Sequence, residues 1–459
     1  MRKTRSRSFP VLIMTLAFFA GLVYFICNLI NNAPQWSSVP WNGHISDSDG
    51  LSNAGVITDV NGVVLARSED GKRIYNDDEN VRRACLHIVG DNSINIASAV
   101  QTMYRTELSG YSFLWGLGSP EIVKQSKDIH LTIDYRVQKA AYEALEGHRG
   151  AVFVYNYKSG DILCMVSTPA YDPYNVPEDI ETNDEYEGAY INRAISASYP
   201  PGSTFKLVTG AAGLENDPNV INYEYDCTGR DKIGDNYIIC YAPSGHVDFA
   251  DALMYSCNAY FGKMAFTLGK DKMTEQAEKM GFNSPVVFNG IRTISSSYDV
   301  KDATDNQLGW SGVGQYTVLE SPINMAIRSA SIANSGVGIT PQLITNSADL
   351  SPAASEKTED RRMLSTMTAD SLKKMMLRTV TNFYGSYRFT ESLTVGAKTG
   401  TAEVGDGKAP HAWVTGFTED DDCPLAFSVV VENGDSGISA AIPVASAVLT
   451  KAAEVMRND

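Results

Sequence analysis

The chain has 459 residues, 43% of them hydrophobic and 20% charged, a composition that is ordinary for a globular protein. This length gives room for two or three domains with sizeable cores. The formal net charge is -16 at pH 7, and no basic stripe follows the first few residues, so the composition argues against a nucleic-acid partner.

The N-terminal segment has the pattern of a membrane anchor. Arg2, Lys3, Arg5 and Arg7 precede Phe9 to Ile30, a stretch without any charged side chain. As a helix this stretch reaches about 33 Å, enough to span a bilayer. Basic residues on its N-terminal side predict that this end is cytoplasmic and that the chain after about residue 31 lies outside the cytoplasm. A cleaved signal peptide is the alternative, but the apolar run is long for one, so we expect an uncleaved anchor.

Residues 31–128 form a polar segment in which we find no nucleophile set and no phosphate loop. Its strand-like runs, Val56 to Val60 and Val63 to Ala66, flank an Asn61-Gly62 turn and predict a hairpin. We interpret this segment as a non-catalytic spacer or docking module. The pattern changes near Ile129, where a strand followed by a helix indicates the start of a second domain, 129–459.

The second domain carries strands at both ends and helices in between. A hairpin is predicted at 151–155 and 161–166, mainly helical structure at 203–290, and a helix at 321–333 that Ser321 and Pro322 would begin. Three consecutive strands are predicted at 394–401, 412–417 and 425–432, and a closing amphipathic helix at 444–456. This order predicts an α+β fold in which an antiparallel sheet assembles from the two sequence ends, with helices packed against it.

Six of the seven cysteines lie outside the anchor, where thiols can be oxidised. Cys227 and Cys240 flank a short polar segment containing Gly229 and Gly234, which can turn back as a hairpin or a loop. This spacing predicts a Cys227–Cys240 disulfide, with two free or buried thiols as the alternative. No Cys/His spacing indicates zinc, and we expect neither a metal nor a cofactor.

A candidate nucleophile lies in the stretch Tyr199 to Lys206. Two prolines and a glycine readily precede a helix, so Ser203 should lie in its first turn, where free backbone N–H groups favour a developing oxyanion. Lys206, three residues later, lies on the same face and can take the serine proton if its amine is held neutral. The same spacing occurs at Ser371 and Lys374, but within an ordinary amphipathic helix.

Two further motifs follow in order. Ser256-Cys257-Asn258 comes between predicted helices, and Lys398-Thr399-Gly400-Thr401 ends a predicted strand. Similar triplets at 93–95 and 158–160 lack this order. With its three motifs the chain resembles the class B, monofunctional penicillin-binding proteins over nearly its whole length. Segments 150–152, 165–173, 192–194, 314–315 and 321–326 match the same family.

The resemblance implies a peptidoglycan D,D-transpeptidase and a role for each motif residue. Ser203 would attack the carbonyl between two D-alanines of a stem peptide, Lys206 would take its proton, and Ser256 would relay that proton to the leaving amine. Asn258 would orient Lys206 and the substrate, and the positive charge of Lys398 would keep Lys206 unprotonated. Gly400 would leave room for a substrate strand, Thr399 and Thr401 would bind its carboxylate, and the N–H groups of Ser203 and Thr401 would form an oxyanion hole.

β-Lactams mimic the D-Ala-D-Ala bond, so the resemblance also implies acylation of Ser203 by penicillins. A serine β-lactamase or D,D-carboxypeptidase is one alternative, and a non-catalytic β-lactam sensor is another. The expected partners are peptidoglycan stem peptides, β-lactam antibiotics, the membrane and a membrane glycan polymerase.

Overall fold

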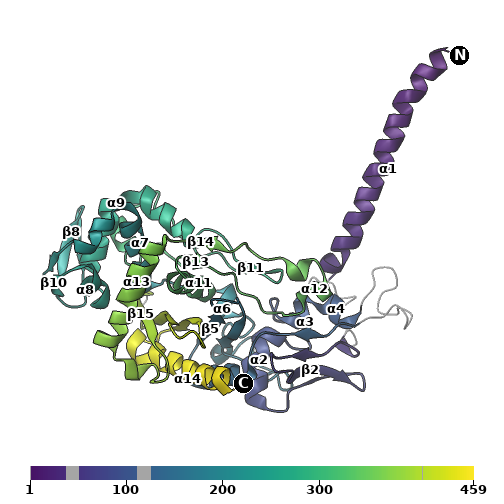
Figure 1. Cartoon of the computed structure of the whole chain (residues 1–459). Coiled ribbons are helices and arrows are strands. Elements are labelled where there is room, and N and C mark those ends of the chain that lie inside the picture. Colours follow the sequence, from purple (N-terminus) through teal and green to yellow (C-terminus); the bar gives the residue numbers. More distant parts are fainter. Residues whose placement is uncertain (1, 38–50, 111–125, 406, 459) are drawn as a thin grey trace.

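The computed structural model describes residues 2–37, 51–110, 126–405 and 407–458. Helix α1 (Arg2–Ser37) extends away from the rest of the chain, and its foot contacts a small N-terminal module (Figure 1). The expected α+β fold is confirmed, because the large domain is built on an antiparallel sheet with helices on both faces.

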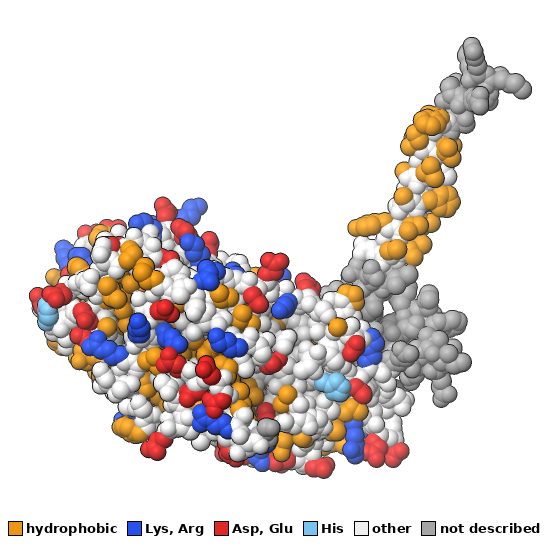
Figure 2. Space-filling view, in the orientation of Figure 1, with side chains coloured by type: hydrophobic (Ala, Val, Ile, Leu, Met, Phe, Trp, Pro, Cys, Tyr) orange, Lys and Arg blue, Asp and Glu red, His pale blue; other side chains and the backbone are white. Residues whose placement is uncertain are grey.

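Helix α1 presents apolar side chains to its surroundings. Its segment Phe9–Leu29 has a mean hydropathy of 2.3 and is not buried at all by the rest of the chain. Figure 2 shows hydrophobic side chains along this helix with no charge among them. Such a helix satisfies its own backbone polar groups, as a lipid environment requires, and is consistent with a single-pass membrane anchor. The second long apolar helix, α14 (Ile442–Asn458), is half buried and belongs to the core.

The N-terminal module contains a four-stranded mixed sheet in the order β3-β2-β1-β4. These strands are β1 (Ile57–Thr58), β2 (Val64–Glu69), β3 (Lys72–Tyr75) and β4 (Ile129–His130), and only the β1–β4 pair is parallel. The hairpin predicted around Asn61-Gly62 is present. Strand β1 is short because Oδ1 of Asp59 accepts the N–H groups of Asn61 and Val63 and turns the chain. Strand β4, just after the expected boundary at residue 128, pairs within this sheet, so the domain division stays a prediction.

The large domain is organised around a five-stranded antiparallel sheet in the order β15-β16-β17-β5-β6. Its two sequence ends meet where β17 pairs with β5, from Leu425 opposite Asn156 to Val431 opposite Gly150. All five strands lie within one or two residues of their predicted positions. They are β5 (Gly150–Asn156), β6 (Ile162–Thr168), β15 (Val395–Ala402), β16 (His411–Thr418) and β17 (Leu425–Val431).

Side chains that alternate along these strands form a separate core on each face of the sheet. Val152 and Val154 pack with α5 (Tyr135–Ala144) and α14, whereas Phe153 and Tyr155 belong to the core on the opposite face. Helix α11 (Pro322–Ala333) crosses that opposite face, and all twelve of its residues are buried. It begins after Ser321 as predicted, although the Ser321 side chain makes no capping hydrogen bond.

The segment 203–290 is less helical than predicted. It contains α7 (Lys206–Asn216), α8 (Phe249–Met254) and α9 (Asn258–Lys279), but residues 225–247 form two small two-stranded sheets, β7–β10 and β8–β9. These strands were missed because three or four residues are too few to show a clear alternation. They are β7 (Tyr225–Cys227), β8 (Arg230–Ile233), β9 (Asn236–Ile239) and β10 (Gly245–Val247).

The remaining elements are short, apart from α2 and α13, and connect these layers. They are α2 (Glu79–Val89), α3 (Val100–Met103), α4 (Arg105–Ser109), α6 (Arg193–Ser196), α10 (Asp305–Ser311), α12 (Ser347–Leu350), α13 (Thr366–Thr379), β11 (Val287–Phe288), β12 (Ile291–Arg292), β13 (Val337–Gly338), β14 (Arg361–Arg362), 3-10 turns at Asp184–Tyr186, Gly202–Phe205, Pro218–Asn222, Ala353–Ser355 and Ser386–Arg388, and π turns at Val380–Tyr384 and Gly437–Ala441.

Candidate active site

The candidate nucleophile lies on a 3-10 turn, Gly202–Phe205, that leads directly into α7. Gly202 has a φ of +53° and donates its N–H to the carbonyl of Gly314 at 3.0 Å. A Cβ on Gly202 would lie 2.5 Å from the carbonyl oxygen of Thr401, so only glycine fits between this turn and β15. The sequence predicted Ser203 in the first turn of a helix, and the structure places it, partly exposed, on the 3-10 turn directly before α7.

Lys206 is completely buried, and its amine has four polar neighbours. Nζ lies 2.6 Å from the carbonyl of Ser256, 2.6 Å from Oδ1 of Asn258, and 3.0 Å from both Oγ of Ser203 and Oγ of Ser256. The first two are acceptor-only oxygens and take two N–H donors. A neutral amine then has only its lone pair left, facing the two serine hydroxyls. Burial lowers the pKa of Lys206 to about 7, so this neutral form exists at neutral pH.

Asn258 and Ser256 are held in place by backbone contacts. Nδ2 of Asn258 donates to the carbonyl of Ile239 at 2.8 Å, which leaves Oδ1 for Lys206 and fixes the orientation of the amide. Ser256 has a φ of +59°, a left-handed conformation that costs about 1–3 kcal/mol for a residue other than glycine. Strain of this kind persists only where the surroundings over-determine it, here at the junction of α8 and α9.

Lys398 lies buried on β15 and reaches the same hydroxyl from the other side. Its Nζ donates to Oγ of Ser256 at 3.1 Å and to the carbonyl of Thr399 at 2.9 Å. Burial, and after it the charge of Lys206, holds the pKa of Lys398 well below its usual value. We expected the charge of Lys398 to be the reason that Lys206 is unprotonated, but burial is the first cause for both lysines. Oγ of Ser256 therefore bridges two buried amines.

The outer edge of β15 carries the three remaining motif residues. The N–H of Thr399 donates to the hydroxyl of Tyr384 at 3.0 Å and so points away from β16. Because alternate residues of a strand point their N–H groups the same way, the N–H of Thr401 also points outward. A Cβ on Gly400 would lie 2.6 Å from the carbonyl oxygen of Pro201. Glycine is thus needed for the approach of the nucleophile turn, whereas we expected it to make room for substrate.

Tyr384 is a site residue that the sequence did not reveal. It ends the π turn that follows α13, is buried, and lies 2.8 Å from Oγ1 of Thr399 in addition to accepting its N–H. No motif marks it, because a single tyrosine after an amphipathic helix has no distinctive pattern. Tyr384 can be recognised only from the fold, which brings the end of α13 beside β15.

Three cysteines meet beside the site. The sulfurs of Cys227, Cys240 and Cys257 are buried and lie within 4.8 Å of one another, the Cys227–Cys240 distance being 3.6 Å and the Cys240–Cys257 distance 3.8 Å. The two sulfurs predicted to form a disulfide are adjacent but not bonded. The sequence missed Cys257, since a spacing of this kind does not show which third thiol the fold brings close.

The repeated motifs lie in ordinary structure. Ser371 is inside α13, where Lys374 is exposed and Lys373 pairs with Glu419 at 2.9 Å. Lys158 belongs to the turn of the β5–β6 hairpin, where its amine donates a hydrogen bond to Oδ1 of Asn334.

A buried ion pair supports the nucleophile turn from behind. Arg328 and Glu320 meet at 2.7 Å with both side chains fully buried, and Arg328 also lies 3.4 Å from the carbonyl of Thr204. Removing one partner would leave an uncompensated buried charge, so the pair holds α11 and the turn together.

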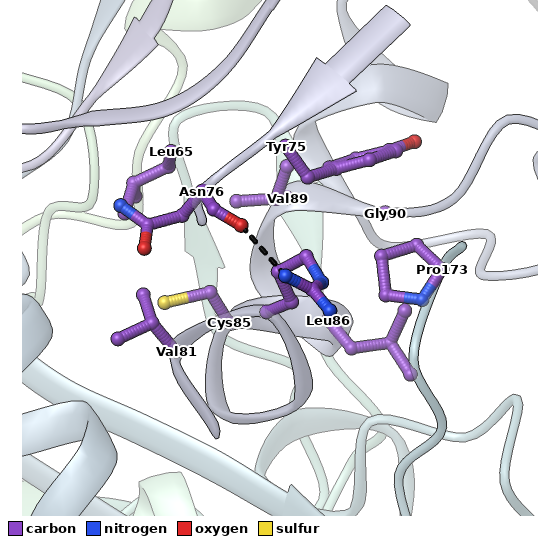
Figure 3. Close-up of a pocket in the computed structure, with 10 residues that line it drawn as sticks. Leu65, Tyr75, Asn76, Val81, Cys85, Leu86, Val89, Gly90 and Pro173 are labelled. Carbon is purple, nitrogen blue, oxygen red and sulfur yellow. Dashed lines mark hydrogen bonds between the residues drawn. The ribbon is translucent and has the colours of Figure 1, made fainter. Parts of the chain in front are cut away.

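A small cavity in the N-terminal module is unrelated to this site. It has a volume of about 10 Å³, room for a single water molecule, and its lining includes Leu65, Cys85 and Pro173 (Figure 3). Arg82 closes one side by donating to the carbonyl of Asn76 at 3.0 Å. It is too small for a substrate.

A serine hydroxyl beside the lone pair of a buried lysine, on a turn against the edge of a sheet, is the chemical arrangement of a serine acyl-transfer enzyme. The penicillin binding protein transpeptidase domain matches residues 150–450 of the chain. The peptidoglycan D,D-transpeptidase PbpA of Mycolicibacterium smegmatis is 30% identical over 360 residues, which cover 71% of this chain and 72% of that protein.

Solved structures agree with this match. Penicillin-binding protein A from M. tuberculosis, as a ceftriaxone acyl-enzyme complex, has a TM-score of 0.75 at 26% identity and covers 88% of this chain and 100% of its own. The D,D-transpeptidase domain of a peptidoglycan glycosyltransferase from Eggerthella lenta has a TM-score of 0.74 at 27% identity, and the match covers 88% of this chain and 99% of that domain's chain. The chain belongs to the penicillin-binding protein transpeptidase family, among the class B peptidoglycan D,D-transpeptidases.

Proposed function

We propose that this protein cross-links peptidoglycan by D,D-transpeptidation through an acyl-serine at Ser203, and that β-lactams acylate the same serine. The observation that carries the proposal is the contact of 3.0 Å between Nζ of Lys206 and Oγ of Ser203, at an amine whose other two donors are already engaged. The lone pair faces the hydroxyls of Ser203 and Ser256, each at 3.0 Å, so Lys206 can accept the proton of Ser203 and exchange it with Ser256.

The first half-reaction follows from these contacts. Ser203 attacks the carbonyl of the D-Ala-D-Ala bond while its proton passes to Lys206. Oγ of Ser256 lies within 3.1 Å of both lysine amines, so a proton can move from Lys206 through this hydroxyl to the departing amine. Asn258 keeps the Lys206 amine in place, and in the second half-reaction an acceptor amine attacks the acyl-serine with the same groups acting in reverse.

Charge on the reacting carbonyl would be stabilised by backbone donors. The N–H of Ser203 lies in the first turn of a 3-10 segment, where such groups have no partner within the helix. The outward N–H of Thr401 approaches from the strand edge, because Gly400 lets β15 come close to the turn. Two such donors form an oxyanion hole, and the loss of one costs about 3 kcal/mol in known acyl-transfer enzymes. Thr399 and Thr401 would hold the substrate carboxylate with their hydroxyls.

We also propose that the N-terminus is cytoplasmic and that the catalytic domain works outside the cytoplasm, where its substrate lies. The basic residues before the apolar helix support this orientation. The N-terminal module contacts the foot of that helix (Figure 1), a position close to the membrane that suits contact with a second membrane protein. We propose a membrane glycan polymerase as that partner, since its product carries the stem peptides that are cross-linked.

A donor–acceptor assay tests the function. The full chain in detergent is incubated with a synthetic acyl-D-Ala-D-Ala donor and a D-amino acid acceptor, and the products are identified by mass spectrometry. We expect an exchange product that disappears in Ser203→Ala. Hydrolysis without exchange at high acceptor concentration would favour a carboxypeptidase instead. Pull-down through residues 1–128 would test the polymerase.

A further inference from the structure

The three-cysteine cluster, defined as Cys227, Cys240 and Cys257, joins three elements at the wall of the active site. Cys227 ends β7, Cys240 follows β9, and Cys257 is the N-cap residue of α9 and the middle residue of the Ser256-Cys257-Asn258 motif. The Cys240 sulfur lies between the other two, at 3.6 Å from Cys227 and 3.8 Å from Cys257. A disulfide needs a sulfur separation of about 2.05 Å, so Cys240 can bond either neighbour but never both.

The strand end that carries Cys240 also holds the catalytic motif. The carbonyl of Ile239 accepts from Nδ2 of Asn258 at 2.8 Å, and the Cys240 sulfur accepts the N–H of Ala259 at 3.3 Å. A bond between Cys240 and Cys257 would add a covalent link parallel to these contacts and fix the loop in which Ser256 adopts its strained backbone. A bond between Cys240 and Cys227 would draw the strand end toward β7 instead.

Charge on the cluster also affects the pKa of the catalytic base, Lys206. Burial lowers the pKa of Lys206, and negative charge on Cys257 or Cys240 acts in the opposite direction. A hydrogen bond from the Cys257 thiol lowers the pKa of Cys240, with a further bond from the N–H of Ala259. In the described part of the chain, the other charged group that interacts with the Lys206 amine is Lys398 of β15. A disulfide would remove the thiolate and leave Lys206 more easily deprotonated.

We propose that Cys240 is a redox-active thiol that forms a disulfide with Cys257, that Cys227 is the thiol that reopens it, and that this bond tunes the Lys206 general base. The proposal rests on the function proposed above. Cys240 is the least enclosed of the three, at 9% exposure against 2% and 1%, and it is therefore the thiol that an external disulfide meets first.

The steps balance as a two-electron exchange. The Cys240 thiolate attacks an external disulfide, of a protein or a small molecule, and releases one thiolate that takes up a proton. The Cys257 thiol then loses its proton and attacks the Cys240 sulfur, which forms the Cys240–Cys257 bond and releases the second thiol. Two cysteine thiols are oxidised and one external disulfide is reduced to two thiols. Attack of the Cys227 thiolate on the Cys240 sulfur forms a Cys227–Cys240 bond, breaks the Cys240–Cys257 bond and releases Cys257 as a thiolate that takes up a proton, so this exchange needs no further oxidant.

The test separates pairing from catalysis. The full-length protein in detergent is held in a glutathione disulfide buffer or in a dithiol, alkylated, and digested without reduction, so that mass spectrometry maps the bond. Cys227→Ser leaves only the Cys240–Cys257 bond possible, and Cys257→Ser only Cys227–Cys240. Cys423→Ser, a buried thiol elsewhere that contacts Met456, is the matched control. The rate of labelling by a fluorescent penicillin is then measured against pH in each state.

We expect the Cys240–Cys257 bond in oxidised wild type and in oxidised Cys227→Ser, reversed by the dithiol. Oxidised Cys227→Ser should show its acylation midpoint at lower pH than the reduced form, because the disulfide removes the thiolate. A midpoint shift of about half a pH unit makes acylation roughly threefold faster on the acidic limb. Three thiols that stay free in disulfide buffer, a bound metal ion that protects them, or identical pH profiles would overturn the proposal. If no redox state is labelled, the proposed function fails, whereas a normal profile without a bond defeats only this inference.

Discussion

The hydroxyl of Tyr384 accepts the backbone N–H of Thr399 at 3.0 Å and lies 2.8 Å from the Oγ1 of the same residue. This double contact closes the outer edge of β15 at Thr399, so that the edge becomes available to an added strand only from Gly400 onward. Tyr384 also fixes the Thr399 hydroxyl, which we propose as a ligand of the substrate carboxylate. The tyrosine is thus a positioning residue for the strand that faces Ser203.

We predict that Tyr384→Phe weakens acylation while the fold is retained. Phenylalanine keeps the ring in its buried place but leaves the N–H of Thr399 without its acceptor, at a cost of about 1–3 kcal/mol. The rate of penicillin labelling should fall roughly tenfold, and the loss should be larger for ligands with a carboxylate than for their esters. Tyr387→Phe, at an exposed tyrosine of the neighbouring turn, is the control and should label normally. Equal losses for acid and ester would contradict the positioning role.

The elements that sequence could predict are those whose signal is local. Strands of seven or eight residues between turns are long enough to be recognised, as in β17, a nearly continuous apolar run that is buried along its whole length. The order of the three motifs also predicted which serine and lysines the structure brings together. By contrast, the strands of 225–247 are too short to show a period, and Gly400 is explained by Pro201, a residue almost two hundred positions away.

Energetic causes were harder to predict than positions. The lowered pKa of Lys206 comes first from burial, which depends on what the folded chain packs around the amine. Sequence suggested a charge from Lys398 because charged residue types are visible in a sequence and burial is not. The contact of Tyr384 with Thr399 and the approach of Cys257 to Cys240 are likewise products of tertiary packing alone.

The pH dependence of acylation should report on Lys206. Its pKa is lowered to about 7, so below this pH the amine takes up a proton and loses the lone pair that faces Ser203. The second-order rate of penicillin labelling should therefore fall about tenfold per unit as pH drops below 7 and level off above it. Lys206→Ala should slow acylation by roughly 10²-fold or more and should remove this inflection. An inflection that persists in Lys206→Ala would assign it to another group.

The choice of serine can be tested with the repeated motif. Ser203→Ala should abolish covalent labelling by penicillin, because the nucleophile is lost. Ser371→Ala should label as the wild type does, since Ser371 lies on α13 with an exposed Lys374. Intact protein mass after incubation with penicillin measures both. A mass increase in Ser203→Ala, or its loss in folded Ser371→Ala, would show that the nucleophile is misassigned.

The apolar helix should remain in the mature protein. Its segment Phe9–Leu29 is long enough to span a bilayer, and basic residues precede it. N-terminal sequencing of the membrane-extracted protein should give the start of the chain and not a residue near 31. Lysines of the catalytic domain, such as Lys301, should react with a membrane-impermeant reagent in intact cells with a permeable wall. Labelling only after lysis would reverse the orientation.

Release of the acyl group should be slow, and this separates a transpeptidase from a β-lactamase. Hydrolysis of an acyl-serine needs a water and a base to activate it. Two carboxylates lie near the nucleophile turn, but the buried Glu320 is paired with Arg328, and the half-buried Glu432 with Arg193 and the Tyr199 hydroxyl. The cation beside each carboxylate stabilises the charged form and makes the carboxylate a weaker base for a water. Incubation with labelled penicillin should therefore give about one label per chain, as expected for a reaction that stops at the covalent intermediate.

The label should stay on the protein far longer than the acylation takes. The measurement is the decay of labelled protein after removal of free penicillin, followed by intact mass. Glu432→Gln keeps the hydrogen-bonding shape of the side chain and is the matched variant, and it should not speed or slow this decay. Rapid multiple-turnover hydrolysis of a chromogenic cephalosporin by the wild type would identify an activated water after all. In that case a faster decay in wild type than in Glu432→Gln would name Glu432 as the base, since only its carboxylate distinguishes the two proteins.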